Sequence, residues 1–154
     1  MTEAPLPEGF HFRKLQITDK TDYLELLSHL TTVTPMTDEE WNSRFEEINS
    51  LPHVYYICLV IETTTNRIAS AASIFFERKF IHNRGICGHI EEVVTHPDFR
   101  KKGLGKAVIT HLLNMAHETY GCYKVLLSCK EAVKPFYESC GMEHRSQTMM
   151  KYWL

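Results

Sequence analysis

CGHIEEVVTHPDFRKKGLGK, residues 87–106, is the stretch that decides how this 154-residue chain is interpreted. Its first part is an apolar run of strand character that ends at Pro97, a residue suited to the exit of a strand rather than to its middle. From Gly103 the apolar period becomes helical, and four side chains share one face: Leu104, Val108, Leu112 and Met115. The stretch therefore predicts a strand, a basic loop that contains two glycines, and a helix.

The basic loop suits an anionic ligand. The start of a helix leaves about four backbone N–H groups without partners inside the helix, and the helix dipole adds about half a positive charge there. Because glycine lets a ligand approach the backbone closely, Arg100–Lys106 can bind a phosphate or a pyrophosphate. A Walker loop is excluded because Ala107 follows Lys106, and the GxGxxG dinucleotide fingerprint is incomplete. A solvated basic turn is the alternative that the loop alone leaves open.

The other elements are predicted from apolar periodicity, capping patterns and turn residues. Before the central stretch we expect a strand at 9–15, a helix at 22–31, a second helix that starts at the capping box TDEE (37–40), and strands at 54–62 and 68–80. After it we expect a strand at 124–129, a helix at 133–140 and a final strand at 144–154. The first helix should present Tyr23, Leu27 and Leu30 on one face. Strands that alternate with helices in the second half indicate at least one parallel pair in a mixed sheet.

Length and composition favour a single domain over residues 1–154. The net charge of −2 argues against general nucleic-acid binding. No apolar run approaches the ~20 residues that a membrane span needs and the N-terminus lacks a signal-peptide pattern, so a cytoplasmic protein is expected. The five cysteines are widely spaced and odd in number, and the nine histidines show no HExxH or similar spacing. Neither a disulfide framework nor a metal site is therefore predicted.

The chain resembles a known family. RKKGLGK after EEVVTHPDF resembles the R/Q-x-x-G-x-G/A motif of the GNAT superfamily of N-acetyltransferases, whose backbone amides bind the pyrophosphate of acetyl-coenzyme A (acetyl-CoA). The resemblance is closer to the branch that acetylates glucosamine 6-phosphate, and it rests on six segments: LTTV (30–33), ERKFIH (77–82), CGHIEEVV (87–94), GLGK (103–106), GCYKVLLSC (121–129) and FYESCG (136–141). It implies an α/β (α+β) fold, with a central mixed sheet that is splayed at the acetyl-CoA site and flanked by helices.

The same resemblance implies which residues bind acetyl-CoA. Strand backbone pairs with the pantetheine arm like an added strand, the basic loop holds the pyrophosphate, and a tyrosine lies near the sulfur. By resemblance these residues are Val93, Val94 and Thr95 in the strand, Arg100, Lys101, Lys102, Gly103, Leu104, Gly105 and Lys106 in the loop, and Tyr137.

Three residues are expected to act in catalysis. Tyr137 matches the tyrosine that can protonate the departing thiolate, and a phenol with a reference pKa of about 10 is a competent donor at neutral pH. Glu91 and Glu92 are adjacent in a strand, so they should face opposite sides unless a bulge intervenes. One of them, with Glu91 preferred, is expected to orient sugar hydroxyls and favour deprotonation of the amine. Cys140, one helical turn after Tyr137, either packs internally or faces the same cleft.

The phosphosugar site is also implied by resemblance, and it includes contacts across the interface of a homodimer with shared active sites. The expected substrate-binding residues are Thr31, Lys79, Phe80, Ile81, His82, Glu91, Glu92, Val93, Tyr123, Lys124 and Ser128. Tyr123 and Lys124 match residues that the family presents across that interface. Ser128 stands where related enzymes carry Asp or Glu, and its hydroxyl can still form a hydrogen bond with the sugar or the amine.

Two other functions remain open from the sequence. A protein N-acetyltransferase on the same fold would need an open groove for a peptide, and the KFIH and GCYK segments would have no phosphate to bind. A non-catalytic acetyl-CoA-binding module is kept open by Ser128. Comparing turnover of glucosamine 6-phosphate, glucosamine and a peptide amine tests the protein N-acetyltransferase. Release of free thiol on addition of the phosphosugar tests the non-catalytic module.

Overall fold

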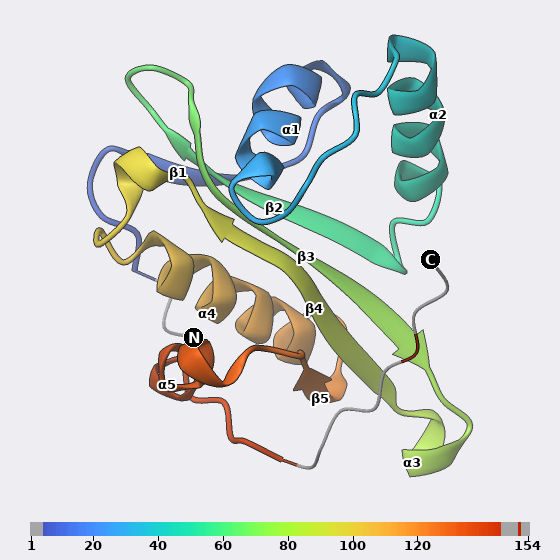
Figure 1. Ribbon diagram of the computed structural model, residues 1–154. Coiled ribbons are helices and arrows are strands. Elements are labelled where there is room, and N and C mark those ends of the chain that lie inside the picture. Colours follow the sequence, from blue (N-terminus) through green and yellow to red (C-terminus); the bar gives the residue numbers. More distant parts are fainter. Residues whose placement is uncertain (1–4, 146–150, 152–154) are drawn as a thin grey trace.

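The computed structural model describes residues 5–145 and residue 151, and it contains one five-stranded sheet flanked by helices (Figure 1). The strands are β1 (Phe10–Lys14), β2 (Tyr55–Glu62), β3 (Ile68–Arg78), β4 (Ile86–Thr95) and β5 (Cys122–Leu126). The α-helices are α1 (Lys20–Ser28), α2 (Asp38–Asn49), α3 (Ile81–Arg84), α4 (Leu104–Glu118) and α5 (Lys134–Ser139). Three 3-10 turns complete the order: η1 (Ile17–Asp19), η2 (Pro97–Phe99) and η3 (Glu131–Val133).

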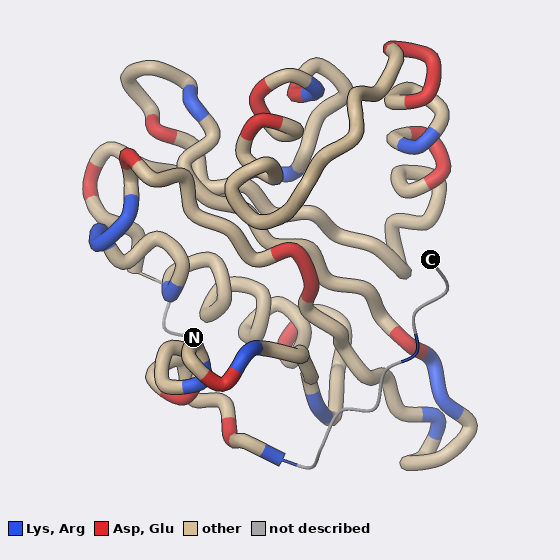
Figure 2. The backbone as a smooth tube through the Cα atoms, in the orientation of Figure 1, with Lys and Arg blue, Asp and Glu red and all other residues tan. Residues whose placement is uncertain are grey.

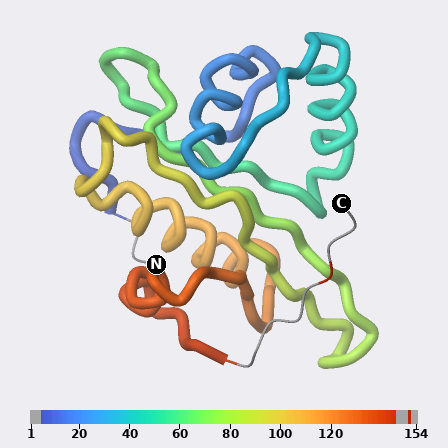
Figure 3. Tube along the Cα trace, viewed as in Figure 1, coloured from blue at the N-terminus to red at the C-terminus, as the bar shows by residue number. Residues whose placement is uncertain are grey.

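The sheet is mixed, as the sequence predicts. Its spatial order is β1-β2-β3-β4-β5. The pairs β1–β2, β2–β3 and β3–β4 are antiparallel, and β5 runs parallel to β4. A parallel neighbour requires a crossover connection, and α4 provides it between β4 and β5. Figure 3 shows α1 and α2 on one face of the sheet and α4 and α5 on the other.

Each face of the sheet has its own apolar core. On the α4 face the predicted helix stripe of Leu104, Val108 and Leu112 is buried, with Met115 partly buried against the same cluster. On the α1 and α2 face the buried side chains include Tyr23, Leu26 and Trp41. The predicted capping box at the start of α2 is present, with the hydroxyl of Thr37 accepting a hydrogen bond from the Glu40 amide and the Glu40 carboxylate accepting one from the Thr37 amide.

The first helix is shorter than predicted, and part of its expected apolar face was wrong. It ends at Ser28, and the amides of Leu30 and Thr31 both bond back to the carbonyl of Leu27 in a closing turn. The β-branched run from Thr31 to Thr34 and the following Pro35 do not favour another helical turn. Leu30 therefore lies outside the helix and is 46% exposed.

The strands after the first helices also differ from their predicted bounds. The predicted strand at 124–129 begins earlier, at Cys122, because Gly121 adopts a positive φ of 66° and turns the chain directly into the sheet beside Ile86. The predicted strand at 68–80 ends at Arg78, and the turn that contains the KFIH segment follows it. Most of the expected final strand at 144–154 lies outside the described residues, and its described positions 144, 145 and 151 are not in a strand.

Among the described residues no helix is both long and apolar enough to cross a bilayer. The cysteines at 58, 87 and 122 are buried in strands, as small apolar side chains often are. All five cysteines are free thiols.

Candidate active site

The sheet opens between β4 and β5. Parallel pairing extends from Ile86 opposite Cys122 to His89 opposite Leu126, and it stops there although β4 continues to Thr95. Residues 90–95 of β4 therefore have no described strand on that side. An unpaired strand edge presents N–H and C=O groups that a ligand with amide groups can pair with. Val93, Val94 and Thr95, predicted to pair with the pantetheine arm, lie in this open segment.

A β-bulge interrupts β4 at the two predicted acidic residues. The register jumps from Ala71 opposite Val94 to Ser73 opposite Glu91, so that two residues of β4 lie opposite one residue of β3. Glu92 has a φ of 54°, a left-handed conformation that is uncommon for a side chain of this type. The bulge changes which way the side chains point, and Glu91 and Glu92 line two different hollows.

The first hollow, here called the β5 hollow, has a volume of about 1230 Å³ and lies beside the opening of the sheet. Its lining includes Glu91 from β4, residues 122–129 from β5 and the segment after it, Tyr137 from α5, and residues 141–145. It is large enough for a small-molecule substrate and part of a coenzyme. Five predicted site residues meet here: Glu91, Tyr123, Lys124, Ser128 and Tyr137.

Tyr137 is suited to donate a proton in this hollow. Burial raises the pKa of its phenol above the ordinary value, and the nearby Cys129, Cys140 and Glu91 raise it further by charge repulsion. The hydroxyl therefore keeps its proton at neutral and moderately alkaline pH. Cys140 is partly buried, and its thiol donates to the carbonyl of Phe136 at 3.3 Å. The Cys140 thiol lies close enough to raise the pKa of Tyr137, although its own hydrogen bond is to Phe136 in α5.

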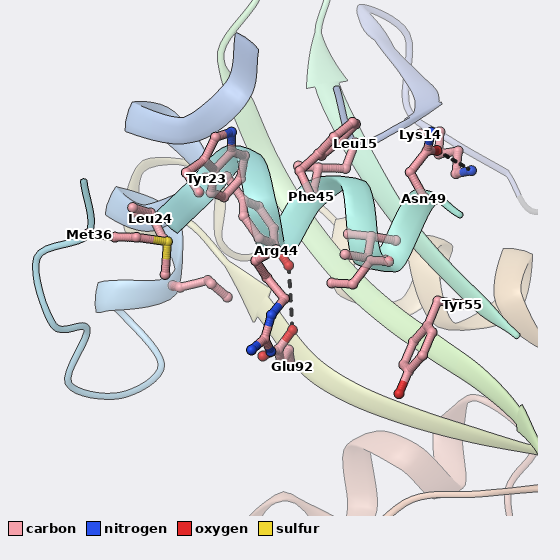
Figure 4. A pocket seen from close by; sticks show the side chains of 14 residues that line it. Lys14, Leu15, Tyr23, Leu24, Met36, Arg44, Phe45, Asn49, Tyr55 and Glu92 are labelled. Carbon is pink, nitrogen blue, oxygen red and sulfur yellow. Dashed lines mark hydrogen bonds between the residues drawn. The ribbon is translucent and has the colours of Figure 1, made fainter. Parts of the chain in front are cut away.

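The second hollow, here called the α2 hollow, has a volume of about 200 Å³ and is lined mostly by apolar side chains of α1, α2 and β2 (Figure 4). The hydroxyl of Tyr23 donates to the carboxylate of Glu92 at 3.5 Å, and Arg44 points into the same space. Burial, and then the negative charge of Glu92, raise the pKa of Tyr23 above its ordinary value. Glu92 is thus separated from Tyr137, which lines only the β5 hollow of the two.

The basic loop has the backbone of an anion site. Lys101 and Gly103 have positive φ values of 62° and 78°, and Leu104 is buried and anchors the start of α4. The first helical hydrogen bond of α4 runs from the Ala107 amide to the Gly103 carbonyl, so the amides of Leu104, Gly105 and Lys106 precede it and have no acceptor inside the helix. Amides that point out of a helix start without partners bind phosphate oxygens well. The amides that a pyrophosphate would need are therefore available.

The cations of the loop differ in their surroundings. Arg100 Nε donates to the carbonyl of Thr95 at 3.3 Å, which ties the loop to the open end of β4. Lys102 Nζ lies over the rings of Phe10 and Phe99, 5.7 and 5.3 Å from their centroids. The side chains of Lys101 and Lys106 form no ion pair with any described residue. These two cations are the ones best placed to meet an arriving anion.

Gly105 permits close packing around the start of α4. A Cβ atom at this position would lie 3.3 Å from the ring of Phe136 and 3.4 Å from the hydroxyl of Thr95. Such contacts are tighter than ordinary van der Waals packing. Its lack of a side chain lets α5, which carries Tyr137, approach the loop and the open strand. One small residue therefore brings the proposed phosphate site and the tyrosine together.

The predicted KFIH segment forms the turn between β3 and β4, which projects from the sheet (Figure 1). Phe80 is fully exposed and Ile81 is 62% exposed. The next three residues, His82, Asn83 and Arg84, all have φ between 51° and 59°, so this short element is a left-handed turn rather than a regular helix. Such a run costs about 1–2 kcal/mol for each non-glycine residue.

Side chains of this turn already have partners. His82 stacks on Tyr123, with 4.4 Å between the ring centroids. Lys79 Nζ lies 2.6 Å from a carboxylate oxygen of Glu77, and the other carboxylate oxygen lies 2.9 Å from His89. The hydrogen bond with Glu77 raises the pKa of Lys79. Figure 2 shows basic residues gathered at this end of the sheet and acidic ones in the middle of β4.

Not all predicted substrate residues come together in one chain. Lys79, Phe80, Ile81 and His82 lie at the projecting turn, Thr31 lies exposed in the connection after α1, and none of them lines either hollow. The sequence analysis missed His89, which lines the β5 hollow with Glu91. Its position two residues before Glu91 in a strand was the available signal, because alternate strand residues share a side.

Comparisons with known proteins are consistent with this geometry. Residues 21–142 match the model of a family described as Acetyltransferase (GNAT) family. A glucosamine 6-phosphate N-acetyltransferase from Arabidopsis thaliana is 45% identical over 96% of this chain and 99% of that protein. Glucosamine 6-phosphate N-acetyltransferase 1 from Dictyostelium discoideum is 37% identical over 94% of this chain and 92% of that protein. The crystal structure of the glucosamine-6-phosphate N-acetyltransferase from Arabidopsis thaliana superposes with a TM-score of 0.89 at 46% identity, covering 95% of this chain and 99% of that chain.

Proposed function

The chain belongs to the acetyltransferase (GNAT) family, and on this premise we propose that it transfers acetyl from acetyl-CoA to the amine of D-glucosamine 6-phosphate. The products are N-acetylglucosamine 6-phosphate and CoA. The observation that carries the proposal is the opening between β4 and β5, where the unpaired backbone of β4 leads into the basic loop and where Glu91 and Tyr137 line one hollow. Relatives that are 45% and 37% identical over nearly the whole chain support the choice of substrate.

Acetyl-CoA fits the residues present. The amides of residues 101–106, with Lys101 and Lys106, hold the pyrophosphate, and the open edge of β4 from Val93 to Thr95 pairs with the amides of the pantetheine arm. The thioester supplies an activated acetyl group. The charge-assisted hydrogen bonds to the pyrophosphate each contribute about 1.5–3 kcal/mol to binding.

The reaction requires two proton transfers, for which the β5 hollow offers one residue each. In the ternary complex the amine nitrogen forms a bond to the acetyl carbon, and the carbon–sulfur bond breaks. Glu91 accepts a proton from the amine, directly or through water, and Tyr137 donates its phenolic proton to the departing thiolate. Ser128 orients the sugar by its hydroxyl. Glu92, in the α2 hollow, accepts a hydrogen bond from Tyr23 and holds the bulged part of β4 against α1.

The phosphate of the sugar is held in a homodimer with shared active sites. The projecting turn carries Lys79, Phe80, Ile81 and His82, and the fully exposed Phe80 is an apolar side chain suited to packing against a second copy. Together with Tyr123 and Lys124, this turn brings cations from one copy to the hollow of the other. Thr31 contacts the substrate from the connection after α1. Light scattering in solution measures the oligomeric state directly.

We further propose that residues 1–154 form a single domain. The reaction takes place in the cytoplasm, and its product enters UDP-N-acetylglucosamine synthesis.

The test is a thiol-release assay with three acceptors: glucosamine 6-phosphate, glucosamine and a peptide with a free amine. We expect release of free CoA with the phosphosugar and little with the other two. Activity on the peptide alone would establish a protein N-acetyltransferase instead. Binding of acetyl-CoA without thiol release would establish a non-catalytic module.

A further inference from the structure

One imidazole in the β5 hollow has no task in the mechanism described above. His89 lines the hollow together with Glu91, which lies two residues further along β4. Alternate residues of a strand point to the same side, so both side chains leave the sheet from one face. The side chain of His89 is 23% exposed, which leaves part of the ring open to a ligand.

Contacts with β3 fix the imidazole ring. One face of His89 stacks on Phe75, with 4.4 Å between the ring centroids and 6° between the planes. Its Nε2 lies 2.9 Å from a carboxylate oxygen of Glu77. The other oxygen of this carboxylate lies 2.6 Å from Lys79 Nζ, so Glu77 is itself held in place. The ring is therefore oriented before a substrate arrives, and less side-chain freedom is lost on binding.

The contact with Glu77 determines which nitrogen of the ring is available. Hydrogen bonds from Lys79 and then from His89 lower the pKa of Glu77, so its carboxylate is ionised at neutral pH and can only accept. Nε2 of His89 therefore carries the proton and donates it. In the neutral ring Nδ1 then has an unshared electron pair, and it forms no hydrogen bond with any residue among 5–145 and 151. Nδ1 is the polar atom that the ring offers to a ligand.

His89 lies on the acceptor side of the opening. It forms the last β4–β5 pair, opposite Leu126, whereas the part of β4 assigned to the pantetheine arm begins at Val93. Glu91, the proposed base for the amine, lies between these two positions. His89 and Glu91 are about 6.6 Å apart along the strand, a distance comparable to the size of a hexose ring with its hydroxyl groups. An acceptor whose amine lies at Glu91 can therefore present a ring hydroxyl to His89.

We propose that His89 is a substrate-binding residue whose Nδ1 accepts a hydrogen bond from a hydroxyl group of the sugar, with Glu77 as the residue that positions the ring. The inference rests on the proposed function, because it takes an amino sugar as the acceptor in the β5 hollow. A phosphate group presents negative oxygens, which an unshared electron pair repels. His89 thus selects the sugar ring, while the cations of the projecting turn select the phosphate.

Two substitutions separate the two nitrogens of the ring. The side-chain amide of His89→Gln reaches the place of Nε2 and keeps a donor for Glu77, but it leaves no acceptor at the place of Nδ1. The shorter amide of His89→Asn lies near the place of Nδ1 and does not reach Glu77. His53→Gln removes an exposed imidazole from the connection between α2 and β2 and serves as the matched control. Steady-state kinetics of the full chain use glucosamine 6-phosphate and glucosamine as acceptors.

We expect His89→Gln to raise the KM for glucosamine 6-phosphate by about 3- to 10-fold, the usual cost of one lost hydrogen bond between neutral groups. Its kcat and its KM for acetyl-CoA should stay within about twofold of the wild type. The kcat/KM for glucosamine should fall by the same factor, because the contact does not involve the phosphate. His89→Asn should keep most of the affinity for the acceptor, and His53→Gln should keep all of it.

A second test changes the substrate and needs no folded variant other than the wild type. Analogues of glucosamine 6-phosphate that lack the hydroxyl at C1, C3 or C4 are compared with the parent compound. In the wild type, removal of the hydroxyl that His89 contacts should raise KM by about 3- to 10-fold. The same analogue should show no further loss in His89→Gln, since the two changes remove one hydrogen bond.

The results separate this inference from the proposed function. An unchanged KM in His89→Gln would overturn the role of His89, as would a loss with glucosamine 6-phosphate that is absent with glucosamine. Three analogues that all bind the wild type as tightly as the parent compound would overturn it too. A wild type that acetylates no amino sugar would overturn the proposed function itself, and the role of His89 with it.

Discussion

The two halves of the sheet differ in how fully their backbone N–H and C=O groups are paired with neighbouring strands. In the closed half, β2 is paired with β1 on one side and β3 on the other, and the side chains from Cys58 to Ile61 are completely buried. In the open half, β4 and β5 share only the pairs from Ile86 to His89 before they separate. Backbone groups that are paired within the protein stabilise the fold, whereas groups left unpaired at the opening are available to a ligand. The comparison assigns stability to one half and binding to the other.

The largest expected effect is in the open half. Tyr137→Phe should lower kcat by about 10²–10⁴-fold, the usual contribution of a general acid, while the free energy of unfolding and the affinity for acetyl-CoA change little. Steady-state kinetics and calorimetry measure these quantities. Tyr56→Phe, which removes a half-buried phenol from the closed half, is the matched control and should retain kcat. The same kcat in Tyr137→Phe as in the wild type would remove the tyrosine from the mechanism.

The converse effect is expected in the closed half. Leu59 is completely buried, so Leu59→Ala should lower the free energy of unfolding by about 2–5 kcal/mol. The kcat of the folded fraction should stay unchanged, because Leu59 lines neither hollow. Leu126→Ala, at a 37% exposed leucine where the sheet opens, is the comparison and should cost far less. Denaturant unfolding measures the free energy of unfolding of both variants. Equal decreases in the two variants would contradict the division of the sheet into two halves.

Two glycines with the same backbone geometry sharpen the comparison. Gly9, before β1, and Gly103, in the basic loop, have φ of 86° and 78°, and a Cβ at either position meets no atom within 4 Å. Substitution by alanine should therefore cost about 1–2 kcal/mol of stability at both positions, since the left-handed conformation is strained for alanine. Only Gly103→Ala should weaken the binding of acetyl-CoA. Equal coenzyme affinity in the two variants would show that the loop backbone does not hold the coenzyme.

The smallest effect concerns pH. The pKa of Tyr23 is higher in the folded protein than in the unfolded chain, so its contribution is present below pH 10 and is lost as the pH rises. At pH 10.5 the loss is about 0.8 kcal/mol, from the reference pKa of about 10. The stability of the wild type relative to Tyr23→Phe should therefore fall by this amount between pH 8 and pH 10.5. If the free energy of unfolding of the two proteins changed in parallel with pH, the raised pKa of Tyr23 in the folded protein would be contradicted.

Local signals in the sequence predicted the elements that depend on neighbouring residues. The capping box of Thr37 and Glu40 and the apolar stripe of α4 were both confirmed. Parallel pairing in a mixed sheet was also confirmed. The capping box and the stripe follow from residues within a few positions of each other, and the parallel pair follows from the alternation of strands and helices in the second half of the chain.

Features that depend on tertiary contacts could not be predicted in the same way. The left-handed turn from His82 to Arg84 contains no glycine, and although His and Asn are enriched at positive φ, residue types do not signal a run of three such residues. Glu91 and Glu92 line separate hollows, as alternation along a strand predicts, but the position of the bulge at Glu92 depends on the register with β3. The side chains of Glu25, His29 and His96 lie close together only because α1 packs against the end of β4.

The central claim is that the uncommitted amides at the start of α4 hold the coenzyme. Amide hydrogen exchange, measured with and without saturating CoA, tests it residue by residue. We predict much slower exchange for residues 101–106 and for the open part of β4, with no change in residues 57–61 of β2. Unchanged exchange in residues 101–106 at saturating CoA would contradict the account.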